Sequence, residues 1–128
     1  MRVTDTWRLN AGMARIWQQL SLAPGSASIG GTAAAGNDPR YWWQVGSSFN
    51  LAPRHELDIR IRKVGTLPNG PVPSYTAVDL RYGWKVSAKV ELSLTVQNLF
   101  DPSHPEWGAP ANRAEIERAA FFKVLWRI

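Results

Sequence analysis

The side chains best suited to chemistry in this 128-residue chain are two histidines and ten carboxylates, because the chain contains no cysteine. Neither His55 nor His104 has a partner at a metal-ligand spacing in the sequence. The chain also contains no glycine-rich phosphate loop and no nucleophile elbow. We therefore predict no enzymatic activity, no metal site and no cofactor.

The acidic side chains are better explained as partners of arginines than as a catalytic pair. Charged and apolar residues alternate around Asp58, Asp79 and Glu91. Arginines lie two or four positions after the two aspartates, and so on the same side of the predicted strands. We expect these charges to pair across neighbouring strands as a solvated ladder. If the apolar positions face lipid, the charges face the lumen of a barrel. That set consists of Arg60, Arg62, Asp79 and Arg81, with Lys123 and Arg127 beside them.

Basic residues exceed acidic ones, with a net charge of +5 and a pI of about 10.1. Nucleic-acid-binding domains share this balance, but they gather their basic residues in a patch or a stripe. Here the basic residues are scattered, and the densest run is Arg60-Ile61-Arg62-Lys63. We expect no nucleic-acid partner and keep a basic nucleic-acid-binding β domain as the third alternative.

Apolar and polar residues alternate with period two through most of the chain, which predicts β-strands. In the first segment the apolar face runs from Trp7 to Met13, and Arg15 then interrupts it. We expect that strand to reach an interface or to bend at Arg15. The predicted fold class is all-β, an antiparallel meander of about six amphipathic strands. They cover about 7–13, 41–51, 56–64, 75–84, 90–97 and 118–128.

The connections between these strands alternate long, short, long, short and long. Long loops are predicted at 22–39, 66–73 and 99–117, and short turns at 52–55 and 85–89. Outer-membrane barrels show this asymmetry, with short periplasmic turns and longer extracellular loops. No run of about 18 apolar residues is present, so we expect no transmembrane helix. The N-terminus has no apolar region typical of a signal peptide.

Aromatic residues lie near strand ends on the apolar face, where membrane barrels carry aromatic girdles. They are Tyr41, Trp43, Tyr82, Trp84 and Trp126. The same alternation also fits a small soluble β-barrel that encloses its apolar face and binds an apolar ligand. The loop asymmetry and the aromatic positions favour part of a transmembrane β-barrel, and the soluble barrel stays as the alternative.

The most specific signal is the stretch Asn98-Leu99-Phe100-Asp101-Pro102-Ser103-His104-Pro105-Glu106-Trp107-Gly108. With the strand before it, this stretch closely resembles the penultimate strand and last loop of TonB-dependent outer-membrane receptors. Family members typically carry Asn-Leu-Phe-Asp or Asn-Leu-Leu-Asp there, and many continue with Pro-x-His-Pro-Glu-Phe-Gly. The specific match covers about the last third of the chain. The family then shows a Glu-Ile/Val-Pro-Arg element, and Glu115-Ile116-Glu117-Arg118 stands in its place, with Glu117 where proline is usual. At the end of the last strand, Ile128 stands where phenylalanine is usual.

The residues of this motif also have a physical interpretation that needs no ligand. Asn98 tolerates a left-handed backbone and can bond locally at a strand end. Leu99 and Phe100 can cover the upper end of the strand, and Asp101-Pro102 starts a turn that prevents further pairing. We therefore predict a strand-terminating turn without a ligand role.

The resemblance implies that residues 1–128 are the C-terminal segment of a receptor barrel in the outer membrane of a Gram-negative bacterium. We expect the plug domain, the other strands and the export signal to be missing, so that the fragment does not function alone. The family imports iron–siderophore complexes or similar scarce nutrients, with energy supplied through TonB. Its polar lumen suits contacts with the plug, while direct contact with anionic iron chelates stays open.

The resemblance also implies two partners for the chain itself, outer-membrane lipid and the barrel-assembly machinery. That machinery reads a final amphipathic strand that ends in an aromatic residue. TonB would be reached only through the missing N-terminal part. The predicted assembly signal consists of Phe122, Val124, Trp126 and Ile128.

Overall fold

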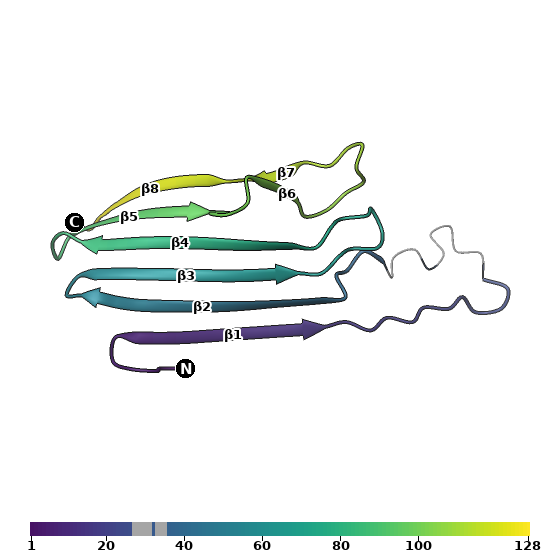
Figure 1. Ribbon diagram of the computed structural model, residues 1–128, viewed down its shortest axis with the longest axis horizontal. Helices are drawn as coiled ribbons and strands as arrows, with labels where there is room; N and C mark the ends of the chain where they lie inside the picture. Colours follow the sequence, from purple (N-terminus) through teal and green to yellow (C-terminus); the bar gives the residue numbers. More distant parts are fainter. Residues whose placement is uncertain (27–31, 33–35) are drawn as a thin grey trace.

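Six antiparallel strands form one sheet in the computed structural model, which describes residues 1–26, 32 and 36–128 (Figure 1). The strands pair in chain order, so the sheet is a meander. This confirms the predicted all-β antiparallel fold. The strands are β1 (Trp7–Arg15), β2 (Tyr41–Ala52), β3 (His55–Val64), β4 (Tyr75–Lys85), β5 (Val90–Gln97) and β8 (Ala119–Trp126).

A second, two-stranded sheet lies between β5 and β8 in the sequence. It consists of β6 (Ser103–Pro105) and β7 (Glu115–Glu117), which pair antiparallel. The expectation of an irregular loop over 99–117 is therefore wrong for these residues. Strands of three residues are too short for an alternation of period two to be visible in the sequence.

The turns and loops lie at opposite ends of the six-stranded sheet (Figure 1). At the turn end, Ala52 pairs with His55 around Pro53 and Arg54. Arg54 has a φ of 74°, so Pro53-Arg54 has the form of a type II turn, in which proline precedes a residue of positive φ.

The loop end holds the long connections. In the connection after β3, Leu67 and Val72 form an isolated bridge around Gly70, whose φ is 83°. The predicted loop at 22–39 falls partly on positions 27–31 and 33–35, which lie outside the described residues.

The register separates the two faces of the sheet as the alternation predicts. One row crosses all six strands: Trp7, Phe49, Leu57, Tyr82, Leu94 and Phe122. We call the side that carries this row the apolar face and the opposite side the polar face. The four charged residues expected to face a lumen alternate with the apolar set and so belong to the polar face.

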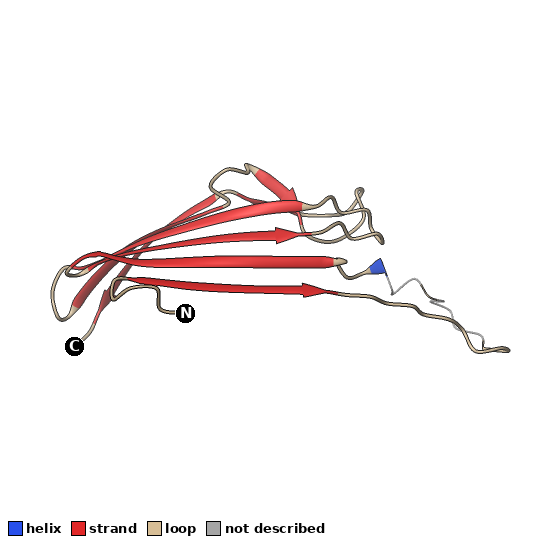
Figure 2. Ribbon diagram, turned by 60° about the horizontal axis from the view of Figure 1, so that its bottom comes forward, coloured by secondary structure: helices blue, strands red, loops and turns tan. Residues whose placement is uncertain are grey.

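The sheet is a single curved layer, and no second layer of the described residues packs against it (Figure 2). Among the described alanine, valine, leucine, isoleucine, methionine, phenylalanine, tyrosine and tryptophan residues, only Val72 and Ala77 are buried. The chain exposes 9213 Å², whereas a compact protein of 14.3 kDa exposes about 6,800 Å². Apart from Ala77, the apolar side chains of the sheet are therefore only partly covered or fully exposed within the described chain.

The sheet is open, because β1 and β8 are its two edges and do not pair with each other in the described residues. A closed barrel with the apolar face inside is thus not what these residues form. Within the same residues, no helix is long and apolar enough to cross a membrane.

Candidate functional site

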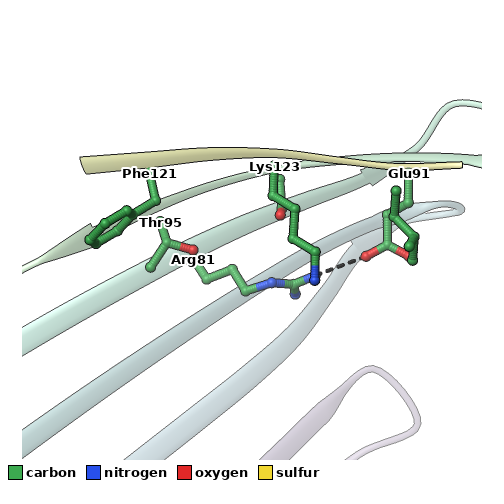
Figure 3. A pocket seen from close by; sticks show the side chains of 7 residues that line it. Arg81, Glu91, Thr95, Phe121 and Lys123 are labelled. Carbon is green, nitrogen blue, oxygen red and sulfur yellow. Dashed lines mark hydrogen bonds and ion pairs between the residues drawn. The ribbon is translucent and has the colours of Figure 1, made fainter. Parts of the chain in front are cut away.

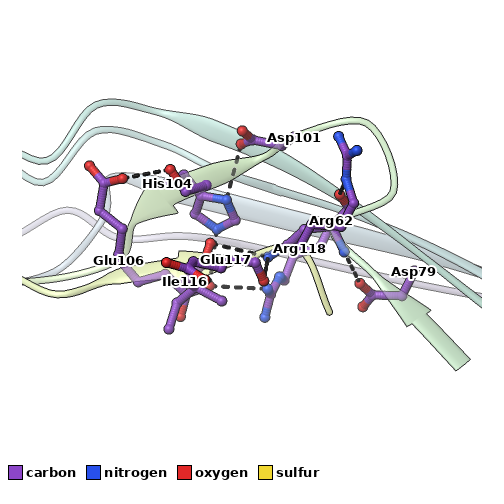
Figure 4. Close-up of polar contacts among 11 residues, drawn as sticks. Arg62, Asp79, Asp101, His104, Glu106, Ile116, Glu117 and Arg118 are labelled. Carbon is purple, nitrogen blue, oxygen red and sulfur yellow. Dashed lines mark hydrogen bonds and ion pairs between the residues drawn. The ribbon is translucent and has the colours of Figure 1, made fainter. Parts of the chain in front are cut away.

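Asn98 joins three strands at the loop end of the sheet. Its side chain is 2% exposed and its backbone has a φ of 53°, in the left-handed region that asparagine tolerates. The amide Nδ2 donates to the carbonyls of Ile116 at 3.4 Å and Glu117 at 3.2 Å. The backbone N–H of Asn98 donates to Oδ1 of Asp79 at 3.2 Å (Figure 4). Asn98 therefore fixes the end of β5 to both β4 and β7.

Arg118, which directly precedes β8, closes this arrangement. Its Nε donates to the backbone carbonyl of Asn98 at 3.2 Å, and its backbone N–H donates to the carbonyl of Pro102 at 2.9 Å. The chain thus leaves β5 and enters β8 at one fixed point. The resemblance included both Asn98 and Arg118, but it did not indicate these contacts, because they join residues far apart in the sequence.

His104 lies in β6, so the expectation that it lies in an irregular loop is wrong. Its side chain is 5% exposed, and its ring stacks on Tyr75 with centroids 4.0 Å apart and planes at 21°. Nδ1 lies 3.0 Å from Asp101, and Nε2 lies 3.4 Å from Glu106. Within the described residues no group of three or more histidines and carboxylates could hold a metal ion. The ring instead packs β6 onto the start of β4.

Glu106 connects the motif to the charges of the polar face. Its Oε1 accepts a hydrogen bond from the guanidinium of Arg62 at 3.1 Å, and that guanidinium lies 5.8 Å from the ring centre of Tyr75. Two sets of predicted residues, the motif and the lumen-facing charges, are thus brought together. We name this group the loop-end cluster: Arg62, Tyr75, Asp79, Asn98, Asp101, His104, Glu106 and Arg118.

Not every motif residue takes part in the loop-end cluster. Phe100 is 78% exposed and does not cover the strand end. Leu99 is partly buried, and its N–H donates to the carbonyl of Val78 at 2.8 Å. Pro105 is buried in β6. Tyr75 was not predicted as a site residue. It lies two residues before Ala77 in β4 and therefore shares the polar face with it.

Arg81 is the centre of a separate group of charges on the polar face. It contacts Asp58 at 3.0 Å, Glu91 at 2.9 Å and Glu56 at 3.8 Å. The predicted ladder between strands is confirmed for Arg81. It is wrong for Asp79, which bonds the Asn98 backbone instead and makes no ion pair within the described residues.

A shallow hollow of about 330 Å³ lies beside Arg81 on the polar face (Figure 3). It is lined by Arg81, Glu91, Ser93, Thr95, Phe121, Lys123 and Leu125. Because Arg81 is already neutralised by carboxylates, the hollow offers mainly hydroxyl, ammonium and ring contacts. Such a mixed lining suits a polar protein surface better than a strongly charged small anion.

Aromatic side chains border the apolar face at the turn end. Trp7 stacks on Phe49 with centroids 5.8 Å apart, and His55 stacks on Trp84 with centroids 5.9 Å apart. The ring of His55 also bonds the hydroxyl of Tyr82 at 2.6 Å. His55 was expected in a turn, but it is the first residue of β3 and shares the apolar face with Leu57.

Tyr41 and Trp43 lie near the loop end of the same face, at the start of β2. The predicted assembly residues are also on this side. Phe122, Val124 and Trp126 are 67%, 56% and 73% exposed on β8, and Ile128 lies beyond the strand. The edge of β8 away from β5 pairs with no strand of the described chain.

Comparisons with known proteins bear on the fold. No protein-family model matches the chain, and no curated protein matches it. Among solved structures, the ferric-catecholate import receptor Fiu from Escherichia coli K12, in its closed form, is similar to 95% of this chain. The TM-score is 0.68 and the sequence identity is 18%.

The chain spans only 19% of the length of that receptor chain. Its sheet therefore has a fold like part of a TonB-dependent receptor.

Proposed function

We propose that residues 1–128 are the C-terminal barrel segment of a TonB-dependent receptor in a Gram-negative outer membrane. The whole receptor would import a ferric siderophore or a similar scarce nutrient, and the segment would not transport alone. The proposal includes no catalytic step, no cofactor and no nucleic-acid partner. The observation that carries it is the exposed apolar face, bordered by aromatic side chains at both ends.

The dimensions of the apolar face support this proposal. The six strands of the sheet have 8 to 12 residues, and a membrane-spanning strand needs about 9–11. From Tyr41 to Phe49, β2 rises about 27 Å at ~3.4 Å per residue. With a tilt of ~40° this is about 21 Å along the membrane normal, near the ~25 Å apolar band of such barrels.

The polar face supports the assignment of a lumen. The Arg81 group and the hollow beside it offer polar and charged contacts on the side that the apolar residues leave free. We propose that this surface contacts a plug domain, in agreement with the mixed lining of the hollow. The receptor with the similar structure imports ferric catecholates, which supports a ferric siderophore as the substrate class here. TonB would act through the plug side of the receptor, and the barrel-assembly machinery would read β8.

Two adjacent tryptophans on opposite faces provide a test. Trp43 lies on the apolar face, and Trp42 lies on the polar face. Single-tryptophan variants that keep only Trp43 or only Trp42, with the other tryptophans changed to phenylalanine, are inserted into phosphatidylcholine vesicles with brominated acyl chains. We expect the fluorescence of Trp43 to be quenched at least about threefold more than that of Trp42. Equal quenching contradicts a lipid-facing apolar surface.

A second measurement separates the proposal from the soluble barrel. In buffer without detergent we expect the wild-type chain to aggregate, because its apolar face and its two strand edges are exposed. A dispersed monomer with a cooperative thermal transition would instead support a small soluble barrel. Tight nucleic-acid binding that weakens steeply with salt would support the third alternative.

A further inference from the structure

Two basic residues lie on the apolar face, and both are at the loop end. Arg15 follows Met13 in the alternation of β1, and Lys63 follows Ile61 in that of β3. Side chains that alternate in a strand share a face. Both cations therefore point to the side that the proposed function assigns to lipid.

Both cations adjoin aromatic residues of the loop end. In the register, Arg15 pairs with Tyr41, and Lys63 pairs with Trp43. Arg15 also lies over the ring of Trp17, with its guanidinium carbon 4.7 Å from the ring centre. Aromatic rings at this level mark the border between acyl chains and headgroups in membrane proteins. The two cations thus stand at headgroup level.

Neither cation has an ion-pair partner in the described part of the chain. Lys63 makes one long contact, 3.5 Å to the hydroxyl of Ser74, and Arg15 has only the ring of Trp17. On the polar face, by contrast, Arg81 and Lys85 are paired with carboxylates. The positive charge of the apolar face is therefore available to an external anion.

The turn end of the apolar face differs. The strands place no lysine or arginine on the apolar face there, among the described residues. The basic groups of that end belong to the turns or to the polar face, as Lys85 does through its bond to Glu56 at 2.9 Å. The outward charge is thus asymmetric between the two borders of the apolar band.

We propose that Arg15 and Lys63 bind phosphate groups of a phosphorylated lipid in the leaflet at the loop end. This inference rests on the proposed function, because it takes the apolar face to lie in a membrane. The two Cα atoms are two strands and two residues apart, which gives about 12 Å from ordinary sheet spacings. Long side chains on such a base can reach two phosphates of one headgroup or of two neighbouring lipids. A guanidinium binds phosphate through two parallel hydrogen bonds, and an ammonium binds it as a point charge.

The test uses the full chain in nonionic detergent micelles, titrated with lipid A that carries both phosphates or with the same lipid dephosphorylated. The wild-type chain should bind the phosphorylated lipid at least about tenfold more tightly, the scale expected for two cations at an anionic lipid surface. Arg15→Gln combined with Lys63→Gln should remove that preference. The matched control is Arg60→Gln combined with Lys123→Gln, which removes the same charge from the polar face and should keep it.

Several results overturn the inference. They are equal binding of the two lipids by the wild-type chain, loss of the preference in the control, or full competition by millimolar inorganic phosphate, which would indicate a free-phosphate site. The quenching of Trp43 in uncharged phosphatidylcholine vesicles separates this failure from that of the proposed function. If Trp43 is quenched without a phosphate preference, only the present inference fails. If Trp43 is not quenched, the membrane assignment fails with it.

Discussion

Substituting Asn98 should loosen the entry into β8 by an amount that depends on the replacement. Alanine removes two hydrogen bonds from Nδ2 to the carbonyls of residues 116 and 117, at about 1 kcal/mol each. Alanine also lacks the short polar side chain that lets asparagine adopt the left-handed backbone at a φ of 53°, at about 1 kcal/mol more. Glycine removes the same bonds without that strain. We therefore expect losses of about 3 kcal/mol for Asn98→Ala and about 2 kcal/mol for Asn98→Gly.

Amide hydrogen exchange of the chain in detergent micelles measures this loss directly. The reporter is the backbone N–H of Arg118, which donates to the carbonyl of Pro102 at 2.9 Å. If local opening limits exchange, it should accelerate about 150-fold in Asn98→Ala and about 30-fold in Asn98→Gly, at about 1.4 kcal/mol per tenfold change. Amides in the middle of β3 should change little, and they are the internal control.

The two variants test separate parts of this reasoning. If neither accelerates exchange at Arg118, the bonds of Asn98 do not hold the end of β5 to β7. If both accelerate it equally, the left-handed backbone contributes nothing. Asn98→Asp adds a check, because a carboxylate keeps the shape but cannot donate to carbonyls and lies near Asp79. It should weaken protection at least as much as glycine does.

Three further predictions concern other parts of the molecule. Residues 118–128, grafted as the last strand of a complete receptor, should give more folded receptor in the outer membrane after Ile128→Phe and almost none after Trp126→Asp; normal assembly of the latter excludes an assembly signal. His104→Ala removes a buried ring stacked at 4.0 Å and should speed proteolysis of the chain at 106–114 by about tenfold or more, whereas His104→Phe, which keeps the stacking, should recover part of the protection. Arg81→Met leaves three nearby carboxylates without their shared cation and, since Arg81 is partly exposed, should cost about 1–2 kcal/mol in urea unfolding in micelles, against little for Arg60→Met.

The faces of the sheet could be predicted from the sequence because the sheet is a single layer. The alternation of period two alone then determines on which face of the sheet each side chain lies, as for Leu57 and Asp58 on opposite faces. The turn at Pro53-Arg54 was equally visible, since proline ends a ladder and favours the first corner of a turn. Predictions of this kind need only neighbouring residues.

The loop-end cluster could not be predicted in the same way. His104 depends on Tyr75, which lies on another strand, and Asp79 bonds a backbone N–H that its own sequence neighbours do not reveal. The alternation predicted arginine partners for Asp79 in general, and in the register Arg60 does lie opposite it. The carboxylate of Asp79 instead accepts a hydrogen bond from the backbone N–H of Asn98. The position of this donor is fixed by the backbone, whereas an arginine side chain is flexible.

The loop-end cluster also explains how β8 can pair with β5 in a defined register after a long connection. Closing the stretch of about seventeen residues from Pro102 through Arg118 costs about 1.3 kcal/mol more than closing a four-residue turn, from the logarithmic dependence on loop length. Each buried hydrogen bond of the cluster returns about 1 kcal/mol, and the bonds of Asn98 and Arg118 alone exceed the difference. Because Gln97 pairs with Ala119 directly beside these bonds, the first pair of the last ladder is already set when the cluster forms. The rest of β8 can then pair with β5 one residue after another. The motif therefore determines the register of the last strand, and ligand contacts are made by other surfaces.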